Sequence, residues 1–154
     1  MKRTESAEDQ LRGFLAKFTP EIAGLAAAVL VKMRKRLPGA VELVYDNYNA
    51  LVIGFGPTER PSEAPFSIAV YPRWINLFFL RGKGLRDPEK LLKGSGNFVR
   101  SIMLENAGTL DDPAVVDLME QALERAAVPL DVTQKRKLII RAIAVKQRAR
   151  RPAK

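Results

Sequence analysis

The spacing of apolar residues changes twice along this chain, and this change limits the folds that the chain can adopt. Apolar residues recur every three or four positions up to Leu37, alternate from Val41 to Leu104, and return to helical spacing after Pro113. Consecutive strands without intervening helices pair in antiparallel fashion, because parallel pairing needs a long crossover. The sequence therefore predicts an α+β fold with two N-terminal helices, an antiparallel sheet of about five strands, and two C-terminal helices packed on the sheet.

Residues that favour helix ends bound the two N-terminal helices. Ser6 with Asp9 three places later is typical of a capping box, and Thr19 before Pro20 is a second start signal. The second helix is expected to stop near Leu37, because a Pro-Gly pair follows. The strands predicted after it cover residues 41–46, 51–55, 66–70, 74–80 and 98–104.

Two helices are predicted after the strands. Asp112-Pro113 begins the first, which runs to Ala127. Its inward face is expected to carry Val116, Met119, Leu123 and Ala126. Asp131 with Gln134 is similar to a further capping box and predicts a final helix. The apolar residues of that helix are Leu138, Ile139, Ala142, Ile143 and Val145.

The length of 154 residues fits one domain with its own hydrophobic core. We expect this domain to cover residues 1–146 and a basic tail to cover residues 147–154. No apolar run reaches the roughly 18 residues that a membrane span requires. The first residues also lack the apolar segment of a secretory signal peptide, so we expect a cytoplasmic protein without a membrane span.

The chain contains no His and no Cys, which excludes several kinds of site. A Ser-His-Asp or Cys-His nucleophile, a thiolate or imidazole zinc site and a disulfide scaffold all need these residues. Catalysis or metal binding would have to rest on carboxylates, Lys, Tyr, Ser, Thr or backbone groups. No paired acid and base beside a nucleophile emerges, so we expect a protein that is not an enzyme.

The net charge of +9 is concentrated at the C-terminus. The last 25 residues hold nine Lys or Arg and one acid, which leaves the preceding 129 residues with a net charge of only +1. Such a basic segment is typical of a surface that binds nucleic acid or anionic membranes. A solvated face of a docked helix with a frayed tail is the other interpretation. The candidate binding residues are Lys137, Arg141, Arg148, Arg150 and Arg151.

A glycine-containing segment is the most phosphate-like part of the remaining chain. Lys93-Gly94-Ser95-Gly96 combines backbone N–H groups that can converge on an anion with Lys and Ser donors. Arg100 follows closely and shares a strand face with apolar residues, so it either pairs with a carboxylate or anchors a ligand. A glycine turn between two elements is the simpler interpretation, since no Walker motif is present.

Two further groups are candidates for ligand or metal binding. Asp117, Glu120 and Glu124 lie along one ridge of the helix that begins at Pro113 and offer oxygen ligands for iron, although such a ridge is also the ordinary polar face of a helix. Tyr45, Tyr71 and Arg73 lie on or between adjacent strands and are candidates for lining a shallow pocket.

Residues 41–127 resemble the YdhG-like family, a bacterial group of domains of unknown function. The likeness rests on Tyr45-Asp46-Asn47-Tyr48-Asn49, Gly54-Phe55, Pro65-Phe66-Ser67-Ile68, Tyr71-Pro72-Arg73, Leu77-Phe78-Phe79, Asp87-Pro88, Leu91-Leu92-Lys93-Gly94-Ser95-Gly96, Arg100 and Asp111-Asp112-Pro113. The resemblance implies a frataxin-like fold and, for one branch, iron delivery to iron–sulfur cluster assembly through surface carboxylates.

Three functions follow from these observations. The first is a small non-enzymatic module that binds iron or another small ligand, with an iron–sulfur assembly partner implied by the family. The second is an adaptor that binds nucleic acid or an anionic surface through the basic C-terminal helix. The third is an enzyme that uses Lys93, Ser95 and Arg100 on an anionic substrate.

Overall fold

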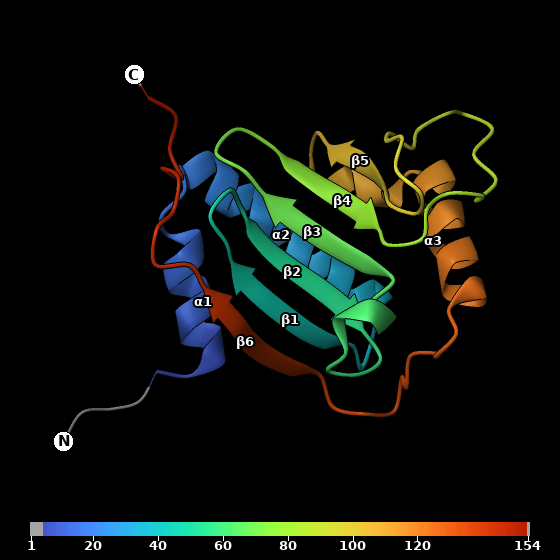
Figure 1. Cartoon of the computed structure of the whole chain (residues 1–154), viewed down its shortest axis with the longest axis horizontal. Coiled ribbons are helices and arrows are strands. Elements are labelled where there is room, and N and C mark those ends of the chain that lie inside the picture. Colours follow the sequence, from blue (N-terminus) through green and yellow to red (C-terminus); the bar gives the residue numbers. More distant parts are fainter. Residues whose placement is uncertain (1–4, 154) are drawn as a thin grey trace.

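The computed structural model describes residues 5–153 and has an α+β fold (Figure 1). Its helices are α1 (Ala7–Leu15), α2 (Pro20–Arg36) and α3 (Pro113–Arg125), with the short 3-10 turns η1 (Pro61–Glu63) and η2 (Ala107–Asp111). Its strands are β1 (Val41–Asp46), β2 (Leu51–Gly56), β3 (Phe66–Val70), β4 (Ile75–Phe79), β5 (Arg100–Leu104) and β6 (Lys137–Ile143).

The two N-terminal helices begin where the sequence predicts. The Ser6 hydroxyl accepts a hydrogen bond from the Asp9 N–H at 3.1 Å, and Thr19 caps α2 in the same way. Gly39 ends the α2 turn with a φ of +78°, and a Cβ atom there would lie 2.2 Å from the Asp131 carbonyl oxygen. Only glycine fits this turn without displacing the backbone. No helix within residues 5–153 is long and apolar enough to cross a membrane.

The sheet has six strands in the order β5-β4-β3-β2-β1-β6. All five strands from β1 to β5 pair in antiparallel fashion, as predicted, but β1 and β6 are parallel. The registers place apolar residues of successive strands on one face, so that Leu77 on β4 lies between Ile68 on β3 and Ile102 on β5. The sheet is therefore mixed rather than purely antiparallel.

The predicted final helix is wrong, because the segment forms strand β6 instead. Asp131 and Gln134 do not open a helix: the Gln134 N–H donates to the Asp131 carbonyl in a turn, and the Gln134 side chain donates to the Gly39 carbonyl at 2.7 Å. Leu138 and Ile140 then pack against the core. The β-branched residues of this segment gain more from pairing with β1 than from a helix.

The parallel pairing of β6 follows from the path of the chain. Strands β5 and β6 occupy opposite edges of the sheet, and α3 lies between them in the sequence. The connection thus crosses the whole width of the sheet, as the orange and red segments of Figure 1 show. The antiparallel pairings from β1 to β5 make β5 run in the same direction as β1, and the crossover starts β6 in that direction again, so β6 is parallel to β1. Only one C-terminal helix, α3, is present within the described residues.

The hydrophobic core lies between one face of the sheet and the helices. Buried residues of this core come from α1, α2, α3 and the strands, and they include Phe18, Met33, Phe55, Phe79 and Met119. Figure 1 shows α2 behind strands β1–β3, with no α-helix in front of them. Within residues 5–153, the α-helices thus cover only one face of the sheet.

The inward face of α3 differs from the predicted one. Val115, Leu118, Met119 and Gln121 are buried, whereas Leu123 is only half-buried. Of the predicted inward residues, Met119 is fully buried. Gln121 is buried because its side chain accepts from the Arg86 N–H at 2.8 Å and donates to the Arg86 carbonyl at 2.9 Å.

A buried carboxylate joins the helices to the sheet beside β6. Glu42 on β1 is fully buried and accepts three hydrogen bonds from Arg34 on α2, at 3.2, 2.9 and 2.8 Å. Glu8 on α1 accepts from both Arg34 and Arg136 at 3.1 and 2.9 Å. These contacts hold α1, α2 and the start of β6 together, since a buried charge must be paired.

Candidate functional site

The residues after β6 run along one end of the sheet rather than continuing as a free tail. The Ala144 N–H donates to the Asp46 carbonyl at 2.8 Å, and the Arg148 N–H donates to the Tyr48 carbonyl at 2.9 Å. The tail therefore follows the β1–β2 turn.

Arg150 anchors this tail. Its side chain is only 3% exposed, and its Nη2 donates to Asp46 Oδ1 at 2.9 Å and to the Asn47 carbonyl. Asp46 is fully buried and also accepts from Lys17 Nζ at 2.6 Å. The guanidinium of Arg150 lies 5.7 Å from the Phe18 ring centroid. Arg150 is thus buried among its partners and is not part of an exposed binding surface, contrary to the sequence-based prediction.

The electrostatics of the anchor favour a charged Asp46. Burial acts to raise the pKa of Asp46 and is the largest single influence. Hydrogen bonds from Lys17, Gln147 and Arg150 outweigh burial and hold the pKa of Asp46 below its ordinary value of 3.8. The Asp46 carboxylate is therefore ionised at neutral pH and fixes the tail in place.

The anchored tail closes one side of a cavity of about 570 Å³, which we call the tail cleft. Its other walls are the β1–β2 turn and the β3–β4 turn. The residues that line it are Asn49, Tyr71, Pro72, Arg73, Trp74, Arg148, Ala149, Arg151, Pro152 and Ala153.

Aromatic side chains form one wall of the tail cleft. The rings of Tyr71 and Trp74 are stacked, with centroids 4.9 Å apart and planes inclined by 21°. Trp74 is 40% exposed, although a ring of its size is usually more buried. One aromatic pair thus presents apolar ring surface to solvent at the cleft.

Three arginines and no acid line the tail cleft. Arg73 and Arg148 have no carboxylate within salt-bridge distance among residues 5–153, and the Arg148 guanidinium lies 5.6 Å from the Tyr48 ring centroid. Arg151 Nε donates to the Lys17 carbonyl at 3.2 Å, which positions its guanidinium at the end of α1. The cleft therefore combines positive charge with aromatic surface.

Sequence-predicted residues from two separate groups meet in this cleft. Tyr71 and Arg73 were candidates for a pocket on the sheet, whereas Arg148 and Arg151 were candidates for a basic surface. Tyr45 does not join them: it lines a smaller hollow of about 280 Å³ on the sheet face that the helices leave uncovered.

Two other basic candidates lie away from the cleft. Lys137 starts β6 and its Nζ is 3.0 Å from Glu59 Oε2. Arg141 lies at the irregularity in the β1–β6 pairing and is exposed. The proposed helical face that would have joined these two residues to Arg148 does not exist, because β6 is a strand.

The glycine segment forms a loop that closes on Arg100. Arg100 Nη1 donates to the Gly96 and Val99 carbonyls at 2.8 Å each, and a Cβ atom on Gly94 would lie 3.1 Å from the Val99 oxygen. The Lys93 backbone exchanges hydrogen bonds with Ser101 at 2.8 and 2.9 Å. Arg100 thus pairs with loop carbonyls rather than with a carboxylate, and Ser95 lies exposed in the same loop.

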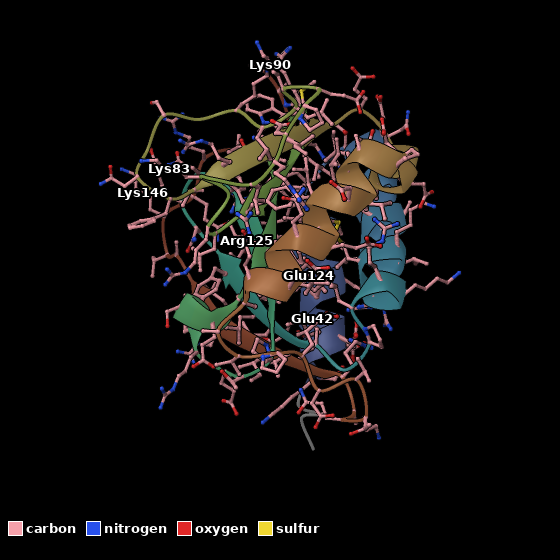
Figure 2. The ribbon with its side chains drawn as sticks, turned by 90° about the vertical axis from the view of Figure 1, so that its right-hand side faces the viewer. Glu42, Lys83, Lys90, Glu124, Arg125 and Lys146 are labelled. Carbon is pink, nitrogen blue, oxygen red and sulfur yellow. The ribbon has the colours of Figure 1, made fainter. Side chains whose placement is uncertain are left out.

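The acidic ridge lies on the exposed side of α3, as predicted. Asp117, Glu120 and Glu124 are all exposed, and Figure 2 labels Glu124 on this helix. Asp117 accepts a hydrogen bond from Gln121 at 2.8 Å. Within residues 5–153, no three carboxylates gather closely enough to hold a metal ion.

Sequence reasoning missed Trp74, the second aromatic residue of the tail cleft. The signal was present as the run Tyr71-Pro72-Arg73-Trp74, in which two aromatics flank an arginine at a turn. Stacking of the two rings across the turn depends on the β3–β4 hairpin, and their approach to the tail depends on β6.

No protein-family model, no curated protein and no solved structure matches this chain. The resemblance to the YdhG-like family and to frataxin stays a prediction.

Proposed function

We propose that this protein binds single-stranded nucleic acid in the tail cleft. The observation that carries the proposal is the meeting of the stacked Tyr71–Trp74 pair with three arginines and no acid in one cavity. Proteins that bind single strands combine a basic groove for the phosphates with aromatic rings on which bases stack. The tail cleft has both elements.

Each side chain has a distinct role in this proposal. Arg73 and Arg148 contact phosphates, because neither is engaged by a carboxylate among the described residues. Trp74 stacks on a base with the ring surface that is free of Tyr71. Arg150 and Asp46 do not touch the ligand but hold the tail that carries Arg148.

The aromatic wall favours a single strand over a duplex. Bases in a duplex are already stacked on their neighbours, so Trp74 can stack only on an unpaired base. Iron binding, which the family resemblance implies, has no support from a carboxylate cluster, because no three carboxylates gather in residues 5–153.

The test is a fluorescence anisotropy titration with a labelled oligo(dT) strand and with a duplex of the same length. We expect the strand to bind more tightly than the duplex. Trp74→Ala should weaken binding of the strand by about 1–3 kcal/mol, the range for loss of one base–aromatic stack. Arg73→Gln and Arg148→Gln should each weaken binding and reduce its salt dependence.

The matched control is Arg86→Gln, which removes the same charge from an exposed residue whose backbone contacts α3. This variant should bind like the parent protein. Equal binding of strand and duplex, together with no effect of Trp74→Ala, would contradict the proposal. An effect of Arg86→Gln as large as that of Arg73→Gln would show that binding follows net charge and not the cleft.

A further inference from the structure

A second cavity lies at the opposite end of the β3–β4 hairpin from the tail cleft. The tail cleft includes the turn from Tyr71 to Trp74, whereas this cavity is lined by Pro65 before β3 and Leu80 after β4. Its volume is about 450 Å³. Each strand of the hairpin has five residues, so the two cavities are separated by about 17 Å of strand. We call this second cavity the α3 pocket.

The apolar part of the α3 pocket contains an aromatic ring, that of Phe98, which is exposed to solvent. Phe98 is 61% exposed, whereas the other apolar residues named in this lining, Pro65, Leu80 and Val128, are half-buried. The segment that follows α3 adds Ala126 and Val128, and Pro65 and Leu80 complete the apolar surface. A cavity of this size and lining is typical of a site for a small molecule.

The charged part of the pocket is positive. Arg81, Lys83 and Arg125 line it, with Glu63 as the one acid in the lining. Glu63 is already engaged, since Thr58 Oγ1 donates to its Oε1 at 2.6 Å. The three cations against one acid give a net charge of +2 in the lining. The C-terminal end of a helix carries a dipole charge equivalent to only about −0.5, so the net charge of the pocket remains positive.

The cations are arranged around the apolar surface. The Arg81 guanidinium lies 5.9 Å from the Phe98 ring centroid, and Arg125 Nη1 donates to the Gly84 carbonyl at 2.8 Å. In Figure 2, Arg125 lies on the side of α3 toward the loop that carries Lys83. A ligand with an apolar body against Phe98 would thus have its polar end near Arg81 and Lys83.

We propose that the α3 pocket binds a small amphipathic organic anion, such as an aryl carboxylate or sulfonate. The apolar body packs on Phe98, Leu80 and Val128, and the anionic group pairs with Arg81 and Lys83. Positive charge beside apolar surface selects this class over neutral apolar molecules and over small hydrophilic anions. The inference does not depend on nucleic-acid binding in the tail cleft.

The test compares two fluorescent probes that share one ring system. 8-Anilinonaphthalene-1-sulfonate carries an anionic group, whereas N-phenyl-1-naphthylamine lacks it. We expect the sulfonate to bind the folded protein more tightly than the neutral amine. Phe98→Ser should weaken sulfonate binding by about tenfold, the loss expected for one buried aromatic contact. Arg81→Gln combined with Lys83→Gln should weaken it by about fivefold and leave binding of the neutral amine unchanged.

Variants of the tail cleft serve as the control. Arg73→Gln removes a positive charge and Trp74→Ala removes an exposed aromatic, so together they match the changes made in the α3 pocket. Neither should alter binding of the sulfonate. Equal binding of both probes would overturn the proposal, and so would a sulfonate affinity that Phe98→Ser leaves unchanged. Loss of nucleic-acid binding with intact probe binding would contradict only the function proposed for the tail cleft.

Discussion

Asp46 is a charged side chain without exposed surface, and its partners come from both ends of the chain. Lys17 lies at the end of α1, and Arg150 lies in the C-terminal tail. Removing one partner of a buried ion pair is costly, because the other charge remains buried and unpaired. Both the stability of the fold and the position of the tail thus depend on the carboxylate of Asp46.

The lowered pKa of Asp46 makes the stability of the protein sensitive to acid. A carboxyl group whose pKa is lower in the folded state stabilises that state above its unfolded-state pKa, and this contribution is lost as the pH falls through the folded-state pKa. We expect the free energy of unfolding to fall as the pH drops below the ordinary value of 3.8. Asp46→Asn should lower the free energy of unfolding at neutral pH by about 3 kcal/mol and flatten its acid dependence.

Urea unfolding at neutral and acidic pH measures both effects. Glu120→Gln, on the exposed side of α3, is the control and should change stability by less than about 0.5 kcal/mol. A variant with Asp46→Asn that unfolds like the parent protein at both pH values would show that the anchor does not stabilise the fold.

Strand β6 is the element whose type sequence reasoning did not recover. Its apolar residues Leu138, Ile139, Ala142 and Ile143 fit a helical stripe, but Leu138 and Ile140 also share one face of a strand. The pairing of Glu42 with Leu138 and of Val44 with Ile140 places both of these residues on the helix-covered face of the sheet. Short apolar runs fit both periods, and the partner strand decides between them.

Amide hydrogen exchange distinguishes the two structures of residues 137–143. An edge strand bonds to its neighbour through every second residue, so we expect protected and unprotected amides to alternate along β6. A helix would protect successive amides alike. Exchange followed by NMR provides the readout, and uniform protection along the segment would contradict the strand. The amides of β3, an interior strand with partners on both sides, serve as the reference for full protection.

In the sequence, the positive charge forms one basic C-terminal segment, but the fold divides these residues between ion pairs and the tail cleft. Of the nine Lys or Arg in the last 25 residues, Arg136, Lys137 and Arg150 form ion pairs with Glu8, Glu59 and Asp46. Arg148 and Arg151 instead join Arg73 from the β3–β4 turn. Folding thus replaces a continuous basic segment with a local site.

The salt dependence of nucleic-acid binding reports how many of these cations are used. For single strands, each phosphate contact contributes about −0.7 to the slope of log K against log salt concentration. We expect a slope of about −1.4 from the phosphate contacts of Arg73 and Arg148 in the tail cleft. Engagement of all nine C-terminal cations would give about −6 instead. Titrations at a series of KCl concentrations measure the slope, and a value near −6 would assign binding to the whole C-terminal segment.

Local signals in the sequence determined the helix starts, the antiparallel order of β1 to β5 and the α+β class. Capping at Ser6, Thr19 and Asp112 and alternation along the strands act between near neighbours, so they can be read without the fold. The absence of His and Cys likewise limits the chemistry to oxygen, amine and guanidinium groups.

Only the tertiary structure decided the type of β6, the role of Arg150 and the composition of the tail cleft. Arg150 lies 104 residues from Asp46 in the sequence, and nothing near either residue specifies their ion pair. Arg148 reaches the Tyr71–Trp74 pair because β6 pairs with β1 and directs the tail past the β1–β2 turn. Contacts between distant segments depend on packing of the whole chain, so the spacing of apolar and polar residues along the sequence cannot predict them.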